Sequence, residues 1–184
     1  MKYPFSALAL ALLLCQNALA SLPPMLQDSQ CSLSLGMPEI NFGNQTRYQL
    51  DEAGAGQLSP GTRELTLAVA CPYSQTMKLA LRGDRAQNGA FRYGERGSVK
   101  IRLFNARVDG QPAELMRSGN AQATSSNSIA LQPGETFVAV RGGAIQQGKT
   151  FTAQVEITPL LPESAARATQ LSSSEARLTL ELLR

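Results

Sequence analysis

The sequence contains no histidine, which removes the commonest general base and metal ligand at neutral pH. Catalytic arrangements built on serine or cysteine with histidine are therefore excluded. Cysteine spacings typical of metal sites, a Gly-x-Ser-x-Gly turn and a phosphate-binding glycine loop are also missing. Asp51 and Glu52 are adjacent carboxylates in a polar stretch, where neighbouring side chains diverge and contact solvent. We expect neither an enzyme nor a bound cofactor or metal.

Net charge is also small. The formal charge is +3 over 184 residues, and it falls by one if Lys2 is removed. Such a balance creates no strong overall field to attract nucleic acid or an anionic membrane. We therefore expect no nucleic-acid partner.

The N-terminus carries an export pattern. One positive charge precedes an apolar run that ends at Leu14, and an Ala-x-Ala site closes at Ala20. We predict that residues 1–20 are a signal peptide. The run is shorter than the roughly 20 residues that a membrane anchor needs, and Leu14 stands before Cys15 where a lipoprotein signal places a small residue. Residues 21–184 then form one domain by length.

The clearest internal pattern runs from Arg63 to Arg85. Two alternating apolar runs flank the sequence Pro-Tyr-Ser-Gln-Thr, which we interpret as a turn, and such period-two alternation predicts half-buried strands. The residues expected to face the core are Leu65, Leu67, Val69, Cys71, Met77, Leu79 and Leu81.

Cysteine is scarce, and its placement predicts a disulfide. If Cys15 is lost with the signal, Cys31 and Cys71 remain, and both are in phase with inward-facing apolar residues. Disulfides persist in exported proteins. We predict a Cys31–Cys71 bridge, which stabilises the fold by roughly 4 kcal/mol in the chain-entropy model. Two free buried thiols are the alternative.

The start of the mature chain is less regular. Residues 21–30 contain two adjacent prolines and are expected to be an extended N-terminal extension. A first strand is predicted at 31–35 and a continuation at 39–43, after Gly36 and a proline. The polar, glycine-rich residues 44–61 are expected to be a flexible loop.

Further alternating segments complete the pattern. Val99, Ile101 and Leu103 are expected to face inward, with Lys100 and Arg102 in water. Other strands are predicted near 91–93, 129–131, 137–140, 150–158 and 175–184, with prolines 159 and 162 ending the strand at 150–158 and one helical turn near Ala165 and Ala166. Eight to ten short strands without a long helical period predict an all-β sandwich over residues 31–184.

Basic side chains gather in the middle of the sequence. Nine of them occur between residues 78 and 117 against four carboxylates, a local excess of five: Lys78, Arg82, Arg85, Arg92, Arg96, Lys100, Arg102, Arg107 and Arg117. A basic face of this kind could bind acidic glycans. The simpler interpretation is outward charges on ordinary strands, balanced by acidic residues elsewhere.

The order of these features resembles chaperone–usher fimbrial (pilin-like) subunits. The shared features are a signal peptide, a cysteine on the first strand, the Ile40-Asn-Phe-Gly43 step and a second cysteine that ends an alternating strand. The segments 129–134 and 148–155 are similar to the closing segments of pilins. The Asp84-Arg85 step, the Ile157-Thr-Pro159 step and the C-terminal leucines look more like a fimbria-linked family of unknown function than like major pilins.

This resemblance implies an immunoglobulin-like (pilin-type) β-sandwich that lacks its last strand and is completed by donor-strand complementation. The implied partners are a periplasmic fimbrial chaperone, an outer-membrane usher and neighbouring fimbrial subunits, and the implied location is the periplasm and then the fimbrium at the cell surface. The implied role is structural, in surface adhesion or biofilm formation. The candidate acceptor-groove residues are Leu33, Leu35, Ile40, Phe151, Val155, Leu178, Leu180 and Leu182, with Ala153 and Ile157 on the same late strand.

Two features depart from pilins. Only Leu22 and Leu26 alternate in the N-terminal extension, which makes it a poor donor strand and favours a tip or minor subunit. The chain also continues beyond the strand on which major pilins end. The last strand is either an edge strand whose terminal Arg184 carboxylate a chaperone holds, or an internal filler of the groove. If it fills the groove, the protein is instead a self-complemented exported binding module, with its basic face on host or matrix glycans.

Overall fold

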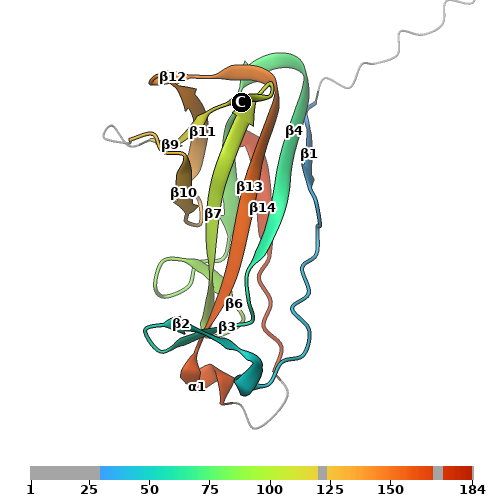
Figure 1. Cartoon of the computed structure of the whole chain (residues 1–184). Helices are drawn as coiled ribbons and strands as arrows, with labels where there is room; N and C mark the ends of the chain where they lie inside the picture. Colours follow the sequence, from blue (N-terminus) through green and yellow to red (C-terminus); the bar gives the residue numbers. More distant parts are fainter. Residues whose placement is uncertain (1–29, 120–123, 168–171, 184) are drawn as a thin grey trace, which may run out of the picture.

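A computed structural model describes residues 30–119, 124–167 and 172–183 of the chain (Figure 1). Nearly all regular structure in these ranges is β-strand, and the paired strands run antiparallel. The strands belong to two sheets. The predicted all-β class is confirmed. The predicted signal peptide, residues 1–20, lies outside the described residues, as does all but Gln30 of the predicted N-terminal extension.

The larger sheet is centred on β13 (Gln147–Pro162), which lies between β4 (Arg63–Thr76) and β7 (Gly97–Val108). Strand β1 (Ser32–Leu35) pairs with β4, and β10 (Ser128–Leu131) pairs with β7. The short members are β2 (Asp51–Gly54), β3 (Gln57–Ser59), β6 (Phe91–Tyr93) and β8 (Gln111–Pro112). Strand β3 pairs with the end of β13, whereas β6 and β8 pair with β7.

The smaller sheet is centred on β5 and β11. Strand β5 (Lys78–Gly83) lies between β14 (Leu178–Leu183) and β11 (Thr136–Arg141). Strands β9 (Glu114–Ser118) and β12 (Ala144–Ile145) both pair with β11. In this order β14 is the last strand on one side of the sheet.

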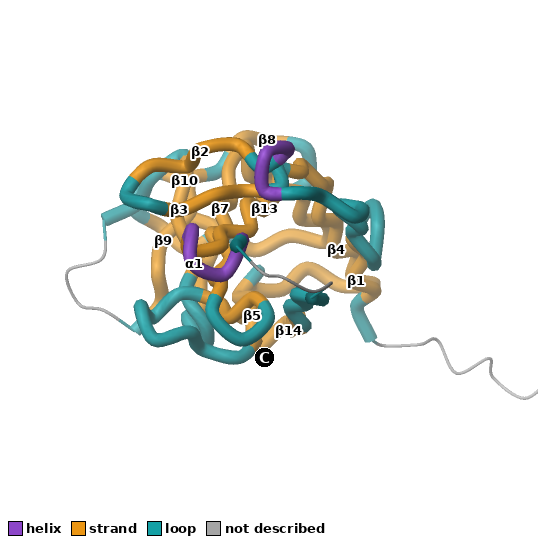
Figure 2. The backbone as a smooth tube through the Cα atoms, turned by 90° about the horizontal axis from the view of Figure 1, so that it is seen from below, coloured by secondary structure: helices purple, strands orange, loops and turns teal. Residues whose placement is uncertain are grey.

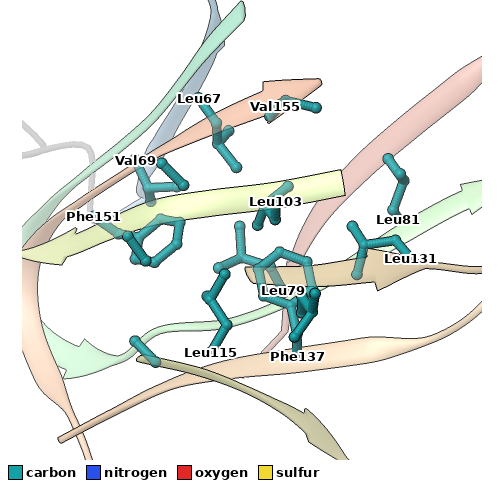
Figure 3. Close-up of a cluster of buried hydrophobic side chains, with 14 of the residues drawn as sticks. Leu67, Val69, Leu79, Leu81, Leu103, Leu115, Leu131, Phe137, Phe151 and Val155 are labelled. Atoms are coloured by element: carbon teal, nitrogen blue, oxygen red, sulfur yellow. The ribbon is translucent and has the colours of Figure 1, made fainter. Parts of the chain in front are cut away.

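The two sheets share one hydrophobic core, which is the arrangement of a β-sandwich. Figure 3 shows side chains of both sheets meeting there, with Leu67 and Phe151 from the larger sheet and Leu79, Leu115 and Phe137 from the smaller one. Phe137 and Phe151 are fully buried. Period-two alternation therefore places every second side chain of the long strands between the sheets.

The core predicted from the sequence is confirmed. The seven inward-facing residues expected between Arg63 and Arg85 are all buried, as are Val99, Ile101 and Leu103. Lys100 and Arg102 are exposed, as the alternation predicts.

The predicted turn after Cys71 is wrong. Strand β4 continues to Thr76 because β13 pairs with this stretch, with Gln147 opposite Thr76 and Gly148 opposite Gln75. The chain then passes at Met77 from the larger sheet to β5 in the smaller sheet. The two alternating runs are consecutive in sequence but pack against each other across the core.

Residues 39–61 also differ from expectation. No strand forms at 39–43, and the expected loop 44–61 contains a 3-10 turn, η1 (Arg47–Gln49), and the β2–β3 hairpin. A tight turn with positive φ at Gly54 and Gly56 makes this hairpin possible. Glycine-rich composition suits a hairpin turn as well as a loop, and tertiary pairing of β3 with β13 selects the hairpin.

The late strand is longer than predicted. Strand β13 continues through Pro159, which lies beyond the last residue that β13 pairs with on β4, Ile157. One edge of β13 is no longer paired with β4 there, and a proline is tolerated at such an edge. The predicted helical turn is confirmed as α1 (Glu163–Ala166). In Figure 1, α1 lies with β2 and β3 at the lower end of the molecule.

Candidate functional site

An apolar groove of about 290 Å³ lies between β1 of the larger sheet and β14 of the smaller one. Its floor consists of core side chains from β4, β5, β7, β10 and β13, and leucines of the two edge strands form its walls. The lining residues are Leu33, Ser34, Leu35, Pro38, Leu67, Leu81, Ile101, Leu103, Leu131, Val155, Ile157, Leu178 and Leu180. Figure 3 labels five of the floor residues, which come from five different strands.

Both walls are sheet edges. Strand β1 pairs with β4 on one side, and β14 pairs with β5 on one side. Within the described parts of the chain, no strand pairs with the other edge of either one. Seen from below in Figure 2, β1 and β14 lie on the same side of the sandwich. A free edge presents unpaired backbone N–H and C=O groups, so both walls can accept hydrogen bonds from, and donate them to, an added strand.

The leucines on the walls are only partly buried. Leu33 and Leu35 alternate with the exposed Ser32 and Ser34, and Leu178 and Leu180 alternate with the exposed Thr179. The alternation points these leucines toward the core, against which they pack, yet the described residues bury them only in part. Half-buried leucines beside two free edges form a surface that further apolar side chains would stabilise.

The start of β14 is closely packed. A Cβ atom on Gly83, the β5 residue opposite Leu178, would lie 2.9 Å from Cδ2 of that leucine. The N–H of Gly94 donates a hydrogen bond of 2.9 Å to the carbonyl oxygen of Glu175, just before the strand. These contacts hold the β14 wall against β5 and the β6–β7 turn.

A disulfide holds the other wall. Cys31 and Cys71 are bonded, which confirms the predicted bridge, and their Cα atoms are 4.2 Å apart. The side-chain amide of Gln75 donates to the sulfur atoms of both cysteines. Cys31 directly precedes β1, so the bridge attaches the start of this short edge strand covalently to β4.

The structure brings together five of the eight groove candidates: Leu33, Leu35, Val155, Leu178 and Leu180. Three lie elsewhere. Phe151 is fully buried deep in the core, because it lies nearer the other end of β13. Ile40 and Leu182 are partly buried and pack against the core without lining the groove. The candidate donor residues Leu22 and Leu26 and the candidate chaperone anchor Arg184 lie outside the described residues.

Most of the floor was not among the sequence candidates. Leu67, Leu81, Ile101 and Leu103 were predicted to be inward-facing, and they are buried. Leu131, for which only a strand was predicted, is buried as well. Period-two alternation identifies the face of a strand but not which part of that face borders an opening. The relative offset of the two sheets decides this, and no local pattern encodes it.

The groove contains no ionisable side chain among its lining residues. The titratable groups with shifted pKa values lie elsewhere. Burial raises the pKa of Tyr93, and hydrogen bonds from Arg167 and Arg47 lower the pKa of Glu163. Hydrogen bonds from Thr150 lower the pKa of Asp109. The groove can therefore hold apolar side chains and pair with backbone, but its lining residues offer no acid or base.

The basic residues do not form one face. Arg82 and Arg117 lie on strands of the smaller sheet, whereas Lys100, Arg102 and Arg107 lie on β7 of the larger sheet. Four of the nine form ion pairs: Arg82 with Glu181 at 2.7 Å, Arg92 with Asp84 at 2.5 Å, Arg102 with Glu156 at 2.7 Å and Arg117 with Glu135 at 3.2 Å. The local excess of positive charge is partly neutralised by acids from elsewhere in the chain.

Among the residues that the structure describes, no group of three or more cysteine, aspartate and glutamate side chains is placed to hold a metal ion. No helix within the same ranges is long and apolar enough to cross a membrane.

No protein-family model matches the sequence, and no curated protein matches it either. The function of the protein is therefore inferred from its fold and its groove.

Proposed function

We propose that this protein is a structural subunit of a chaperone–usher fimbria, and that its groove accepts a β-strand from another protein. The observation that carries the proposal is the apolar groove between two free sheet edges, β1 and β14. An added strand could pair with both edges and place alternate side chains on the floor, which is the strand-addition mode of peptide recognition.

The energetics favour such an occupant. Each Leu-sized side chain that the groove removes from water contributes about 1.5–3 kcal/mol, and each backbone hydrogen bond contributes about 0.5–1.5 kcal/mol. Without a partner, two free edges beside half-buried leucines are an aggregation hazard. A chaperone that lends a strand would cover this surface until the next subunit replaces it.

The positions of the edge strands also support the proposal. The resemblance to pilins implies groove edges on the first strand and on a late or terminal one, and β1 and β14 occupy these places. Leu178, Leu180 and Leu182 are partly exposed, and β14 pairs with β5 alone in the described structure. This layout favours β14 as an edge strand over β14 as an internal filler of the groove.

The proposed cellular context follows from the sequence. The predicted export signal and the disulfide fit passage through the periplasm to the cell surface. The chaperone, the usher and neighbouring subunits are the proposed partners. Because the N-terminal extension is a poor donor strand, we place the protein at the tip or at a minor position. Immunogold labelling at regular intervals along purified fimbriae would contradict that placement.

The alternative is a self-complemented module that binds glycans on a basic face. The structure gives it less support, because the basic residues are divided between two sheets and four of them are ion-paired.

The test is expression in a bacterial periplasm with and without a cognate fimbrial chaperone. We expect degradation or aggregation alone, and a soluble one-to-one complex with the chaperone. Leu180→Asp should abolish this complex, because a carboxylate on the groove wall would be buried without a partner. Thr179→Asp is the matched control on the exposed face of the same strand. A stable monomer without chaperone, together with no effect of Leu180→Asp, would refute the proposal.

A further inference from the structure

We infer that the upper end of the sandwich binds an acidic polysaccharide through three cations, Arg107, Arg141 and Lys149. This end is formed by the β7–β8 turn, the β11–β12 turn and the start of β13. In Figure 1, β12 and the last part of β4 lie there, and α1 lies at the opposite end. None of the three cations lines the groove, so this second binding surface is independent of the strand that occupies the groove.

Two of the cations are held at the β7–β8 turn by its backbone carbonyl groups. Arg107 lies opposite Pro112 in this hairpin, and its guanidinium donates a hydrogen bond of 3.0 Å to the carbonyl oxygen of Gly110. Nε of Arg141, at the end of β11, donates to the carbonyl oxygen of Pro112 at 3.1 Å. A guanidinium carries five N–H donors, and these bonds occupy one in each arginine. The remaining donors can bind a ligand carboxylate.

Lys149 lies on the β13 side of the same turn. Its backbone N–H donates a hydrogen bond of 3.0 Å to Oδ1 of Asp109, and Lys149 is exposed. The pKa of Asp109 is lowered, chiefly by the hydrogen bond from the Thr150 backbone and in part by the positive charge of Lys149. The Lys149 ammonium group therefore lies close enough to the turn to act on its carboxylate.

A β-bulge in β7 turns Arg107 toward solvent. Strict alternation from the buried Leu103 would point residue 107 into the core. The pairing of β7 with β13 instead shifts register at this point, and Asn105 has a positive φ of 53°. Beyond the bulge Val108 is buried and Arg107 is exposed. A bulge that re-aims a side chain in this way is a feature of functional surfaces.

Positive charge at this end is only partly neutralised. The segments that form it contain a single carboxylate, Asp109, whose Oδ1 already accepts three hydrogen bonds from residues 149 and 150. The segments are residues 71–77, 107–113 and 141–150. Within the described part of the chain, none of the three cations takes part in an ion pair. The resulting positive potential attracts a polyanion.

Uncharged polar groups at the same end select the kind of polyanion. Gln111 and Gln147 are exposed, and Tyr73 is 63% exposed. Amide groups both donate and accept hydrogen bonds, as sugar hydroxyls do, and the cations bind carboxylates. A polymer of uronic acids presents both kinds of group. Duplex DNA fits less well, because proteins bind it through many phosphate contacts and this surface has three cations.

This surface differs from the basic face that the sequence suggested. Of the nine basic residues between 78 and 117, only Arg107 belongs to it. The other two cations come from later segments, and the tertiary structure brings them to the β7–β8 turn.

The test is binding to immobilised polygalacturonate, with dextran as the neutral polymer. The full chain is purified from the periplasm, together with its chaperone where the two form a complex, and the chaperone alone is the blank. We expect wild type to bind polygalacturonate but not dextran, and to bind less as salt is raised. Arg107→Gln/Arg141→Gln/Lys149→Gln should bind about tenfold more weakly, because three exposed ionic contacts are lost.

The matched control is Arg63→Gln/Arg96→Gln/Lys100→Gln, which removes the same charge from exposed positions elsewhere and should bind like wild type. Lys149→Gln alone should bind about threefold more weakly. This single change leaves both arginine bonds to the turn in place, so it tests the surface even if the triple variant does not fold.

No binding of wild type to polygalacturonate, or equal losses in the two triple variants, overturns the inference. Tighter binding to a DNA duplex than to polygalacturonate also overturns it, because the surface would then recognise phosphates. None of the substituted residues lines the groove, so every folded variant should still form the chaperone complex. Loss of polysaccharide binding with an intact complex concerns this surface alone, and failure of wild type to form the complex concerns only the proposed function.

Discussion

The two lateral sides of the sandwich are built from similar strands but are finished differently. On the closed side, the chain crosses from β9 in the smaller sheet to β10 in the larger sheet. Leu115 and Ser126 exchange two backbone hydrogen bonds of 2.8 and 2.9 Å there. On the open side, no strand of residues 30–119, 124–167 and 172–183 pairs with the outer edge of β1 or of β14. Figure 2 shows the two pairs of strands on opposite sides of the molecule.

Burial follows the same division. Leu115 is 0% exposed and Ile129 is 5% exposed, whereas Leu178 and Leu180 on the open side are only partly buried. Leucines in alternating strands thus reach different degrees of burial, depending on whether another segment covers the sheet edge. The comparison shows that an edge is a functional candidate when apolar residues border it and nothing in the described chain closes it.

The largest expected effect concerns the Cys31–Cys71 disulfide, which attaches β1 to β4 on the open side. We expect Cys31→Ala/Cys71→Ala to lower the free energy of unfolding by about 4 kcal/mol, because the bridge closes a loop of 40 residues in the unfolded chain. Chemical denaturation of the oxidised wild type and the double variant measures it. The reduced wild type should behave like the double variant, and an unchanged transition would mean that pairing with β4 alone holds β1.

The next prediction contrasts one leucine from each side. Leu115→Ala on the closed side should cost about 3 kcal/mol of unfolding free energy, because it leaves a cavity among fully buried side chains. We expect Leu180→Ala on the open side to cost less, about 1–2 kcal/mol in the isolated protein, because this side chain is only partly buried and its loss leaves no closed cavity. Denaturant midpoints of the two variants give the comparison, and equal costs would mean that the open side is closed in solution.

A smaller effect is expected from the side-chain hydrogen bonds that Arg117 makes on the closed side. The guanidinium of Arg117 donates hydrogen bonds to the carbonyl oxygen of Ala130 at 2.5 Å and to the carboxylate of Glu135 at 3.2 Å. Arg117→Met should lower the unfolding free energy by about 1 kcal/mol, with Arg107→Met, which bonds only the nearby Gly110 carbonyl, as control. Similar losses in both variants would show that the cross-sheet bond adds nothing.

The smallest effect concerns a turn away from both sides. Asp109 accepts hydrogen bonds at Oδ1 from the N–H groups of Thr150 and Lys149 and from the Thr150 hydroxyl, and its pKa is lowered, chiefly by the Thr150 backbone. A lowered folded-state pKa contributes stability that is present above the unfolded-state value of about 4 and is lost as pH falls through the folded-state value. Asp109→Asn keeps the shape and removes the charge.

We therefore expect wild type to be slightly more stable than Asp109→Asn above about pH 5, with the difference shrinking at lower pH. Thermal unfolding of both proteins between pH 7 and pH 3 measures it. A difference that is independent of pH would assign the effect to geometry and not to the charge.

Several parts of the structure could be predicted from alternation alone. It identified the core residues of β4, β5 and β7, and it placed Cys31 and Cys71 on inward positions. The pairing of β1 with β4 then brings the two cysteines close enough to bond. It failed where backbone pairing decided the outcome. Residues 72–76 look like a turn, but β13 pairs with Gln75 and Thr76, so β4 extends to Thr76. Pro159 lies within β13 because the pairing between β13 and β4 stops at Ile157, so that edge needs no N–H from the proline.

The groove was only partly predictable, for the same reason. Leu33 and Leu35 could be identified because they follow a cysteine in phase, and Leu178 and Leu180 because they alternate near the C-terminus. Phe151 was misplaced because its pattern is identical to that of Val155, which does line the groove. Position along a strand determines the difference, and a periodic pattern carries no information about it.

The sequence by itself determined the all-β class, the inward faces of the long strands and the disulfide, because these depend on local alternation and on residue type. Only the tertiary structure decided which strands share a sheet, which side the β9–β10 crossing closes and which leucines stay partly exposed on β1 and β14. Those outcomes depend on pairing between segments that are far apart in the sequence, and on the packing of one sheet against the other.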